Sequence, residues 1–154
     1  MGLDLRGLNF SKAHLRGADF TGARLDGAIM VRTRLDRAEL QGVSLVGARL
    51  SDGCPGSGAV LTGAQLQGAL IDGSDLRYAE LHGAQLAGAR VFRSDLSNAF
   101  LQEADLRGCE IENSQVIEAN LRGADLRGSN LWGANLWGAN LRDANLRDAD
   151  LRGS

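Results

Sequence analysis

One large apolar residue recurs every five positions along the chain, and we call it the centre of its repeat. The centres run without a break from Leu5 to Leu50 and again from Leu61 to Leu151. Two residues before each centre stands a small residue, usually alanine, and the residue between them is polar in most repeats, often Asp or Asn. Two residues after the centre, more than half of the repeats carry glycine.

A five-residue period fits neither a straight α-helix nor a flat strand. Five residues of α-helix advance by about 500°, which would scatter the apolar positions around the helix. In a strand, an odd period would move the apolar residue to the opposite face at each repeat. The conflict disappears if the chain turns a corner once per repeat. The small residue and the centre then both point inward from a short extended stretch, and the next two residues make the turn.

The glycine position predicts a type II turn that starts at the centre, because the third residue of that turn needs a positive φ. We sorted the repeats into four columns by a 20-residue period and counted the interval from Leu50 to Leu61 as one repeat plus one extra residue. Glycine is then concentrated in two adjacent columns. We therefore expect type II turns on two adjacent faces and a different, less glycine-dependent turn on the other two.

The repeats from Ala119 onward read ANLRG, ADLRG, SNLWG and ANLWG, and they closely resemble the pentapeptide-repeat family, whose motif is Ala-(Asp/Asn)-Leu-X-X. The resemblance covers nearly the whole chain. It implies an all-β fold, a right-handed quadrilateral β-helix with four repeats per coil and about 7.5 coils. We expect a single domain over residues 1–154, with a one-residue register break or small loop within residues 51–60. A core this narrow leaves no room for a ligand cavity.

The interrupting segment reads SDGCPGSGAV, and its proline and glycines predict a bulge or a small protruding loop. Some pentapeptide-repeat proteins implicated in quinolone resistance carry loops that matter for function, but a tolerated insertion on one corner is the simpler interpretation. Cys54 lies in this segment and is expected to be exposed. Cys109 occupies a small inward position, so we do not expect a disulfide between the two.

Composition and charge exclude several classes of protein. The chain has 19 acidic and 17 basic residues, a near balance that does not indicate a nucleic-acid-binding protein. No stretch approaches the roughly 18 apolar residues of a membrane span, so no membrane partner is expected. No signal peptide is visible, which makes a cytoplasmic location the default expectation.

The sequence contains no recognisable catalytic apparatus. His14 and His82 are far apart, stand at outward positions and have no metal-site spacing, so we expect both to be solvated. No nucleophile motif, phosphate-binding loop or dinucleotide fingerprint is present. We therefore predict no catalytic residue, no metal site and no cofactor, and we do not expect an enzyme.

Arginines follow several later centres on adjacent faces, where they would form short ladders able to bind phosphate. They are Arg107, Arg122, Arg127, Arg142 and Arg147. Four aspartates are expected to lie close to them, namely Asp105, Asp125, Asp143 and Asp148. We therefore interpret this surface as a solvated face of alternating charge with weak ion pairs.

Two functions remain after these exclusions. The leading one is a non-enzymatic structural scaffold or protein–protein interaction module. The alternative comes from the resemblance, because some family members imitate the shape and charge of a DNA duplex and modulate type II topoisomerases such as DNA gyrase. Net charge is +3 over residues 1–50, −6 over residues 51–118 and +1 over residues 119–154. An acidic middle of this length is too short and too interrupted to imitate a long duplex well.

The candidate interaction surface is an apolar strip in the C-terminal part of the chain. Trp132 and Trp137 follow consecutive centres and should lie outside the core on adjacent faces. Phe92 shares a column with Trp132 two coils away, and Ile117 shares one with Trp137 a single coil away. Such a strip and the unpaired backbone edge of a solenoid predict association through the C-terminal coils. Its simplest form is a tail-to-tail homodimer, and otherwise an unknown protein partner.

Overall fold

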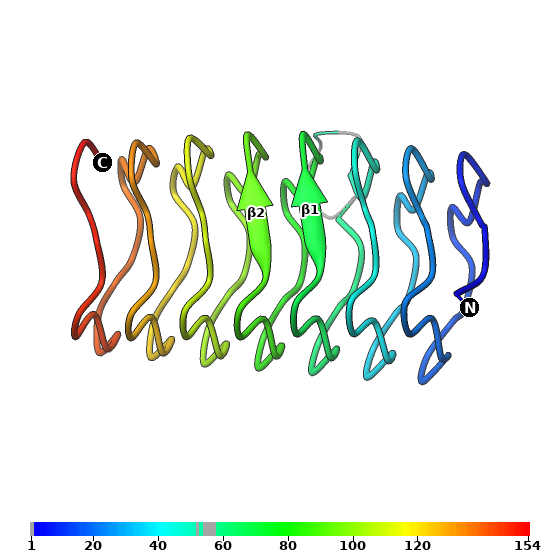
Figure 1. Cartoon of the computed structure of the whole chain (residues 1–154), viewed down its shortest axis with the longest axis horizontal. Coiled ribbons are helices and arrows are strands. Elements are labelled where there is room, and N and C mark those ends of the chain that lie inside the picture. Colours follow the sequence, from blue (N-terminus) through cyan, green and yellow to red (C-terminus); the bar gives the residue numbers. More distant parts are fainter. Residues whose placement is uncertain (1, 52, 54–57) are drawn as a thin grey trace.

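A computed structural model describes residues 2–51, 53 and 58–154 of the chain. The backbone winds into four-sided coils that stack along one axis, with the N-terminus at one end of the rod and the C-terminus at the other (Figure 1). Strands β1 (Leu70–Asp72) and β2 (Arg90–Phe92) form a parallel two-stranded sheet. Every other pairing between coils of the described residues is a single parallel bridge. The rod is therefore a β-helix built mostly from corners rather than from long strands.

The pairing between coils confirms four repeats per turn. Bridges join each residue before a centre to the residue 20 positions later, from Asp4↔Arg24 to Asn130↔Asp150. We name the four corners by the centres of the first coil. Corner A follows Leu5, corner B follows Phe10, corner C follows Leu15 and corner D follows Phe20.

The interruption adds six residues to one coil. Across it the bridges Arg34↔Val60 and Arg49↔Asp75 join residues that are 26 positions apart. The N–H of Ala59 donates to the Leu50 carbonyl at 2.8 Å and closes the corner B that follows Leu50. The sequence-based assignment, which counted the interval from Leu50 to Leu61 as one repeat plus one extra residue, was therefore wrong. It placed every repeat after Leu50 one corner too far along the coil. The predicted loop itself, with Cys54, falls on residues 52 and 54–57 and lies outside the described residues.

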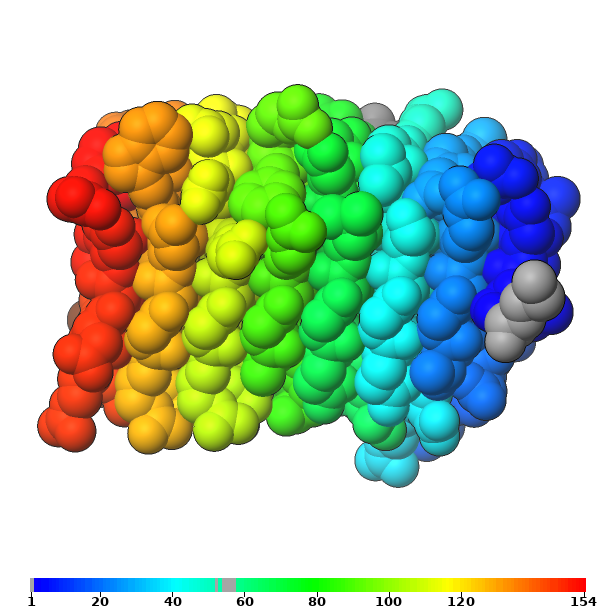
Figure 2. All heavy atoms as spheres, viewed as in Figure 1, coloured from blue at the N-terminus to red at the C-terminus, as the bar shows by residue number. Residues whose placement is uncertain are grey.

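The inward residues of each repeat form one continuous core. All centres from Leu25 to Leu131 are buried, and so are all small residues from Ala23 to Ala134. The space-filling view shows successive coils packed against one another along the whole rod (Figure 2). Each buried leucine contributes ~1.5–3 kcal/mol relative to exposure, so the stacked column of centres supplies most of the stabilisation.

The expectation of two turn types was wrong. In most repeats the centre carbonyl accepts from the N–H three residues later, for example Leu66 from Ala69 at 3.0 Å. The residue two after the centre has a positive φ whether it is glycine or not: φ is 66° at Gly68, 57° at Arg37 and 58° at Tyr78. A sharp corner requires this left-handed conformation at all four positions of the coil. Non-glycine residues adopt it at a cost, which burial of the neighbouring centres offsets.

Buried serines close two turns of corner A in a different way. The Ser94 hydroxyl oxygen lies 3.2 Å from the N–H of Ser74, which donates to it, and 3.2 Å from the Ile71 carbonyl. Ser114 repeats this one coil later, accepting from the Ser94 N–H at 3.2 Å and lying 3.1 Å from the Val91 carbonyl. Each hydroxyl therefore lies within hydrogen-bond distance of the N–H and the carbonyl that would otherwise close the turn of the preceding coil. This explains why serine replaces alanine at these inward positions.

The polar residue before each centre also has a structural role. When this residue is Asp or Asn, its side-chain oxygen accepts a hydrogen bond from the backbone N–H two residues later. That N–H points away from the core. Examples are Asn9 with Ser11 at 2.9 Å, Asp19 with Thr21 at 2.9 Å and Asn130 with Trp132 at 3.0 Å. The Asp/Asn preference of the repeat is thus the sequence signature of a side chain that caps the corner.

Candidate functional site

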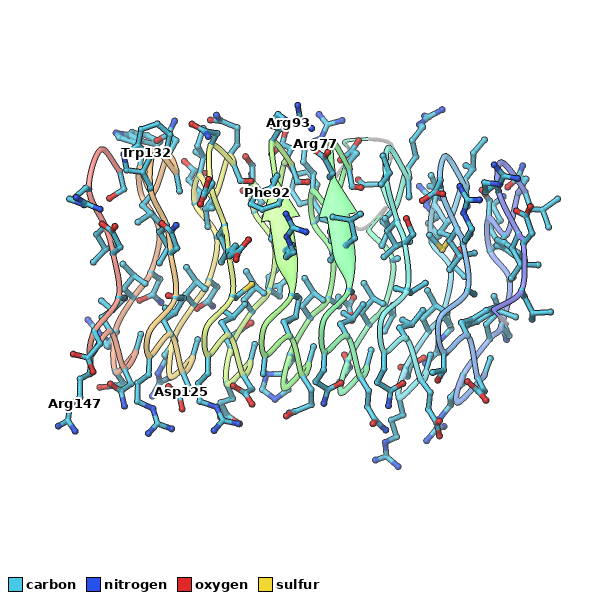
Figure 3. The ribbon with its side chains drawn as sticks, viewed as in Figure 1. Arg77, Phe92, Arg93, Asp125, Trp132 and Arg147 are labelled. Atoms are coloured by element: carbon cyan, nitrogen blue, oxygen red, sulfur yellow. The ribbon has the colours of Figure 1, made fainter. Side chains whose placement is uncertain are left out.

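The two tryptophans of the predicted strip are exposed on consecutive corners of the rod. Trp132 stands at corner A with 49% of its surface exposed, and Trp137 stands at corner B with 68% exposed. Figure 3 shows Trp132 at the outer edge of the rod, with Phe92 nearer the middle of its length. Both indole rings are therefore available to a partner.

On corner A the apolar strip is interrupted. The N–H of Arg93 donates to Glu112 and the N–H of Asn113 donates to Trp132, so Phe92, Glu112 and Trp132 occupy this corner in three successive coils. The Glu112 carboxylate accepts from the side-chain amide of Asn130 at 2.7 Å. Phe92 is half-buried, and the guanidinium of Arg90 lies over its ring. The guanidinium carbon is 5.0 Å from the ring centre. A charged side chain therefore separates Phe92 from Trp132.

On corner B the strip is continuous. The N–H of Glu118 donates to the Trp137 carbonyl at 2.9 Å, which places the repeat of Ile117 directly beside that of Trp137. Ile117 is half-buried. Trp132, Trp137 and Ile117 thus form the part of the predicted surface that the fold brings closest together, and Phe92 stands apart from it.

The tryptophan-bearing corners are held firmly by hydrogen bonds. The N–H of Trp132 donates to the Asn130 side chain at 3.0 Å, and the N–H of Trp137 donates to that of Asn135 at 3.2 Å. The turn after Leu136 is closed by a further backbone bond of 2.9 Å. A partner would therefore meet a preorganised backbone, and the ordering cost of binding would fall mainly on the side chains.

Sequence reasoning missed a third exposed aromatic residue. Phe100 stands before its centre, where most repeats have a polar residue, and 44% of its surface is exposed. It lines a surface hollow of about 250 Å³ together with His82 and Gln102, and a neighbouring hollow of about 450 Å³ shares the latter two residues. The signal was an apolar residue at a position that is normally polar. Both histidines are exposed, as predicted, and His82 lies 3.9 Å from Glu103.

The described residues offer little reactive chemistry. Over residues 2–51, 53 and 58–154, no three His, Cys, Asp or Glu side chains lie close enough together to hold a metal ion. Cys109 is a free, fully buried thiol, as its inward position predicted, and burial raises its pKa to about 12. Within the same residues, no helix has the length and apolarity to cross a membrane.

Some of the predicted ion pairs of the arginine ladders are present, whereas Arg142 and Arg147 form none with a described residue. Arg107 pairs with Asp105 and Arg127 with Asp125, each at 2.6 Å. The hydrogen bond from each arginine lowers the pKa of its aspartate. Figure 3 shows Asp125 and Arg147 on the same edge of the rod.

The other two aspartates behave differently. Arg122 lies 3.5 Å from Asp143, whereas Asp148 forms no ion pair with any described residue. These pairs are exposed, so they mainly neutralise charge and add little stability.

Comparisons with known proteins identify the family. The family model described as pentapeptide repeats matches residues 2–30, 13–52, 57–91, 84–123 and 119–154. Among solved structures, a pentapeptide repeat protein from the thylakoid lumen of Arabidopsis thaliana is 27% identical over 99% of this chain and 70% of its own, with a TM-score of 0.50. A trypsin-treated variant of QnrB1, a plasmid-mediated fluoroquinolone resistance protein, is 21% identical over 99% of this chain and 88% of its own, with a TM-score of 0.53.

No curated protein sequence matches the chain significantly. The family model nevertheless covers almost every residue, and the structure has four repeats per coil, inward centres and a left-handed residue at each corner. The chain therefore belongs to the pentapeptide-repeat family, whose fold is the right-handed quadrilateral β-helix.

Proposed function

We propose that this chain is a non-enzymatic scaffold that binds another protein through the surface formed by Ile117, Trp132 and Trp137. The observation that carries the proposal is the exposure of two tryptophans, 49% and 68%, on adjacent rigid corners. Tryptophan is the residue most enriched among those that dominate binding energy at interfaces. Covering the exposed part of each ring would contribute ~3 kcal/mol before the costs of association are subtracted.

The rest of the molecule supports a binding role rather than a catalytic one. The core is filled by leucine and alanine along its length, and the hollows found among the described residues lie on the surface. The buried thiol of Cys109 stays protonated at neutral pH, because its pKa is raised. Binding by a preformed surface needs neither an enclosed pocket nor a perturbed nucleophile.

Self-association through the C-terminal coils is the simplest form of this proposal. Trp132 and Trp137 are exposed on consecutive corners of the C-terminal coils. A second copy docked tail to tail would cover the tryptophans of both copies.

Sedimentation velocity tests the proposal with a matched control. We expect the wild-type protein to associate as its concentration rises and the Trp132→Ser/Trp137→Ser variant to remain monomeric. Phe100→Ser removes an exposed aromatic from a different corner and should associate like the wild type. A wild-type protein that stays monomeric at high micromolar concentration would exclude the homodimer. Cross-linking in cells with the same three proteins would then test for a different partner that the double variant loses.

The DNA-mimicking alternative has no specific support in the structure. Several acidic residues of the middle coils are paired with arginines, as Asp75 is with Arg77 at 2.7 Å and Asp72 is with Arg93. Figure 3 shows Arg77 and Arg93 on the same edge of the rod, so positive charge interrupts the acidic surface. We expect the protein to leave DNA supercoiling by gyrase unchanged at micromolar concentration. Inhibition or protection of gyrase in that assay would restore the alternative.

A further inference from the structure

Basic side chains gather on one side of the rod in its first two coils, between corners B and C. We call this surface the basic face, and its residues are Lys12, Arg16, Arg32, Arg34 and Arg37. All five are exposed, and Asp36 is the one acidic residue among them. The face therefore carries a net charge of +4 in a chain whose total is −2. The charge is strongly segregated, although the composition is nearly balanced.

Backbone pairing places these side chains in a compact array. The N–H of Lys12 donates to the Val31 carbonyl at 3.0 Å, so Lys12 and Arg32 occupy corner B in adjacent coils. His14 is bridged to Arg34 on the same side, and Arg37 completes corner C. Neighbouring coils are ~4.8 Å apart, which sets the spacing of Lys12 and Arg32 across the two coils.

The basic face lacks the compensation that several arginines have elsewhere in the rod. Arg6 pairs with Asp4 at 2.7 Å and Arg107 with Asp105 at 2.6 Å, whereas Arg49, Arg142 and Arg147 have no ion pair with a described residue. Within the face, Arg34 lies 3.5 Å from Asp36. The other four cations have no ion-pair partner in the part of the chain that the structure describes. These charges remain available to an external anion.

Three of the cations occupy strained corner positions. Lys12, Arg32 and Arg37 have φ values of 63°, 57° and 57°, in the left-handed region where glycine is cheaper. Glycine occupies the same position of corner C in the two adjacent coils, at Gly17 and Gly63. The fold therefore accepts glycine at this corner, and Arg37 carries a backbone cost that a role in binding would explain.

We propose that the basic face binds a short acidic segment of a partner protein. A short acidic segment would place several carboxylates over the two coils of the face, whose net charge is +4 in a chain of total charge −2. Guanidinium groups bind carboxylates in a bidentate manner, which favours the arginines of the face as ligands. The site lies at the opposite end of the rod from Trp132 and Trp137, so it is independent of the function proposed above.

The surroundings of the basic face favour a short peptide over a nucleic acid. Further along the same side of the rod, Val60 separates Arg34 from Glu80 in the bridge series, and Glu103 and Glu118 follow. A long polyanion lying along the rod would meet these carboxylates and be repelled. No Phe, Tyr or Trp stands among residues 11–17 or 31–37 to stack a base, which disfavours single-stranded nucleic acid.

Fluorescence anisotropy with a labelled hexa-aspartate peptide tests the proposal. The test variant is Lys12→Asn/Arg32→Asn/Arg37→Asn, because asparagine tolerates a positive φ and the fold should be kept. The control, Arg142→Gln/Arg147→Gln/Arg152→Gln, makes the same change in net charge at the other end of the rod. We expect the test variant to bind about tenfold more weakly than the wild type and the control to bind about as well as the wild type. A circular dichroism melt confirms that both variants fold.

Several results would overturn this proposal. Equal weakening in the test and control variants would show that the peptide responds only to net charge. Failure of hexa-aspartate to bind better than a hexa-asparagine peptide would show that the face does not select carboxylates. Tighter binding of duplex DNA or of phosphatidylserine vesicles, lost in the same test variant, would assign the face to a nucleic acid or a membrane instead.

Discussion

Replacing Arg37 with glycine should stabilise the protein. Arg37 stands at corner C between Gly17 and Gly63 of the adjacent coils, and the three φ values are 57°, 65° and 63°. The Arg37 side chain is exposed and has no ion-pair partner among the described residues. The substitution therefore changes the backbone cost of the corner and little else.

The magnitude follows from two opposing terms. An L-residue in the left-handed region costs ~1–2 kcal/mol, and the extra freedom of glycine in the unfolded chain costs ~0.5–1 kcal/mol. Arg37→Gly should thus raise the free energy of unfolding by ~0.5–1 kcal/mol, or about 1–4 °C in Tm for a chain of this length. Gly68→Ala should lower it by a similar amount. Its φ is 66° and a Cβ there meets no atom within 4 Å, so strain is the main effect.

Thermal unfolding followed by circular dichroism measures both changes. Arg37→Gln keeps the strain but removes the charge, so it should melt close to the wild type. Arg37→Asn should fall between wild type and Arg37→Gly, because asparagine tolerates the left-handed region better than most residues. A lower Tm for Arg37→Gly would refute the reasoning, since it would mean that this corner does not need a positive φ.

Four further predictions follow from the core and the surface. Leu86→Asp should abolish the cooperative melt, because it buries a carboxylate at a position with 1% exposure, whereas Leu86→Met should still fold. Ser94→Ala should lower the free energy of unfolding by ~1–3 kcal/mol in a urea titration, because the N–H of the serine one coil earlier loses its acceptor. An NMR titration of Asp150 should give a pKa of about 2, because a neighbouring arginine donates to its carboxylate. Since that pKa is below the ordinary 3.8, the contribution of this pair to stability is present above pH 3.8 and lost as the pH falls toward 2. In a Cys54→Ser background, Cys109 should resist a thiol reagent at neutral pH until the protein unfolds, and rapid reaction of the folded protein would contradict its burial.

The core could be predicted because it depends only on local order in the chain. A centre and the small residue two positions before it point to the same side of any extended stretch, so Leu86 and Ala84 were correctly placed inward without knowledge of the neighbouring coils. The paired arginines were predictable for the same reason, since Arg107 and Asp105 are two residues apart.

The turn types were predicted wrongly because glycine frequency reports the cost of a conformation rather than the conformation itself. Tyr78 and Arg93 have φ values of 58° and 47°, in the same left-handed region as the glycines. The burial of a leucine column can hold any residue at such a corner. The presence of glycine therefore indicates corners with little backbone strain, and its absence indicates corners with more strain. It does not indicate a different turn geometry.

Features that depend on stacking between coils could not be read from the local pattern. The coils stay in register across the insertion after Leu50, so sorting the sequence by its period misplaced every later column by one corner. Only the pairing of Arg49 with Asp75 reveals this. Charge summed over residues 1–50 gave +3 and hid the segregation of its bases on one side of the rod. The exposed ring of Phe100 stands before its centre, whereas the predicted apolar strip consisted of residues that follow theirs.

Because each coil contains four repeats, insertions of different size would change either the length of the rod or the relative orientation of its two ends. Adding 20 residues anywhere in the rod would lengthen it by ~4.8 Å and leave both ends facing the same directions. Adding five would instead rotate one end by a quarter turn relative to the other. The six residues inserted after Leu50 do neither, because corner B absorbs them and the coils on either side stay in register. The number of coils between the basic face and the tryptophans therefore fixes their distance along the rod, and the number of repeats fixes the angle between them around its axis.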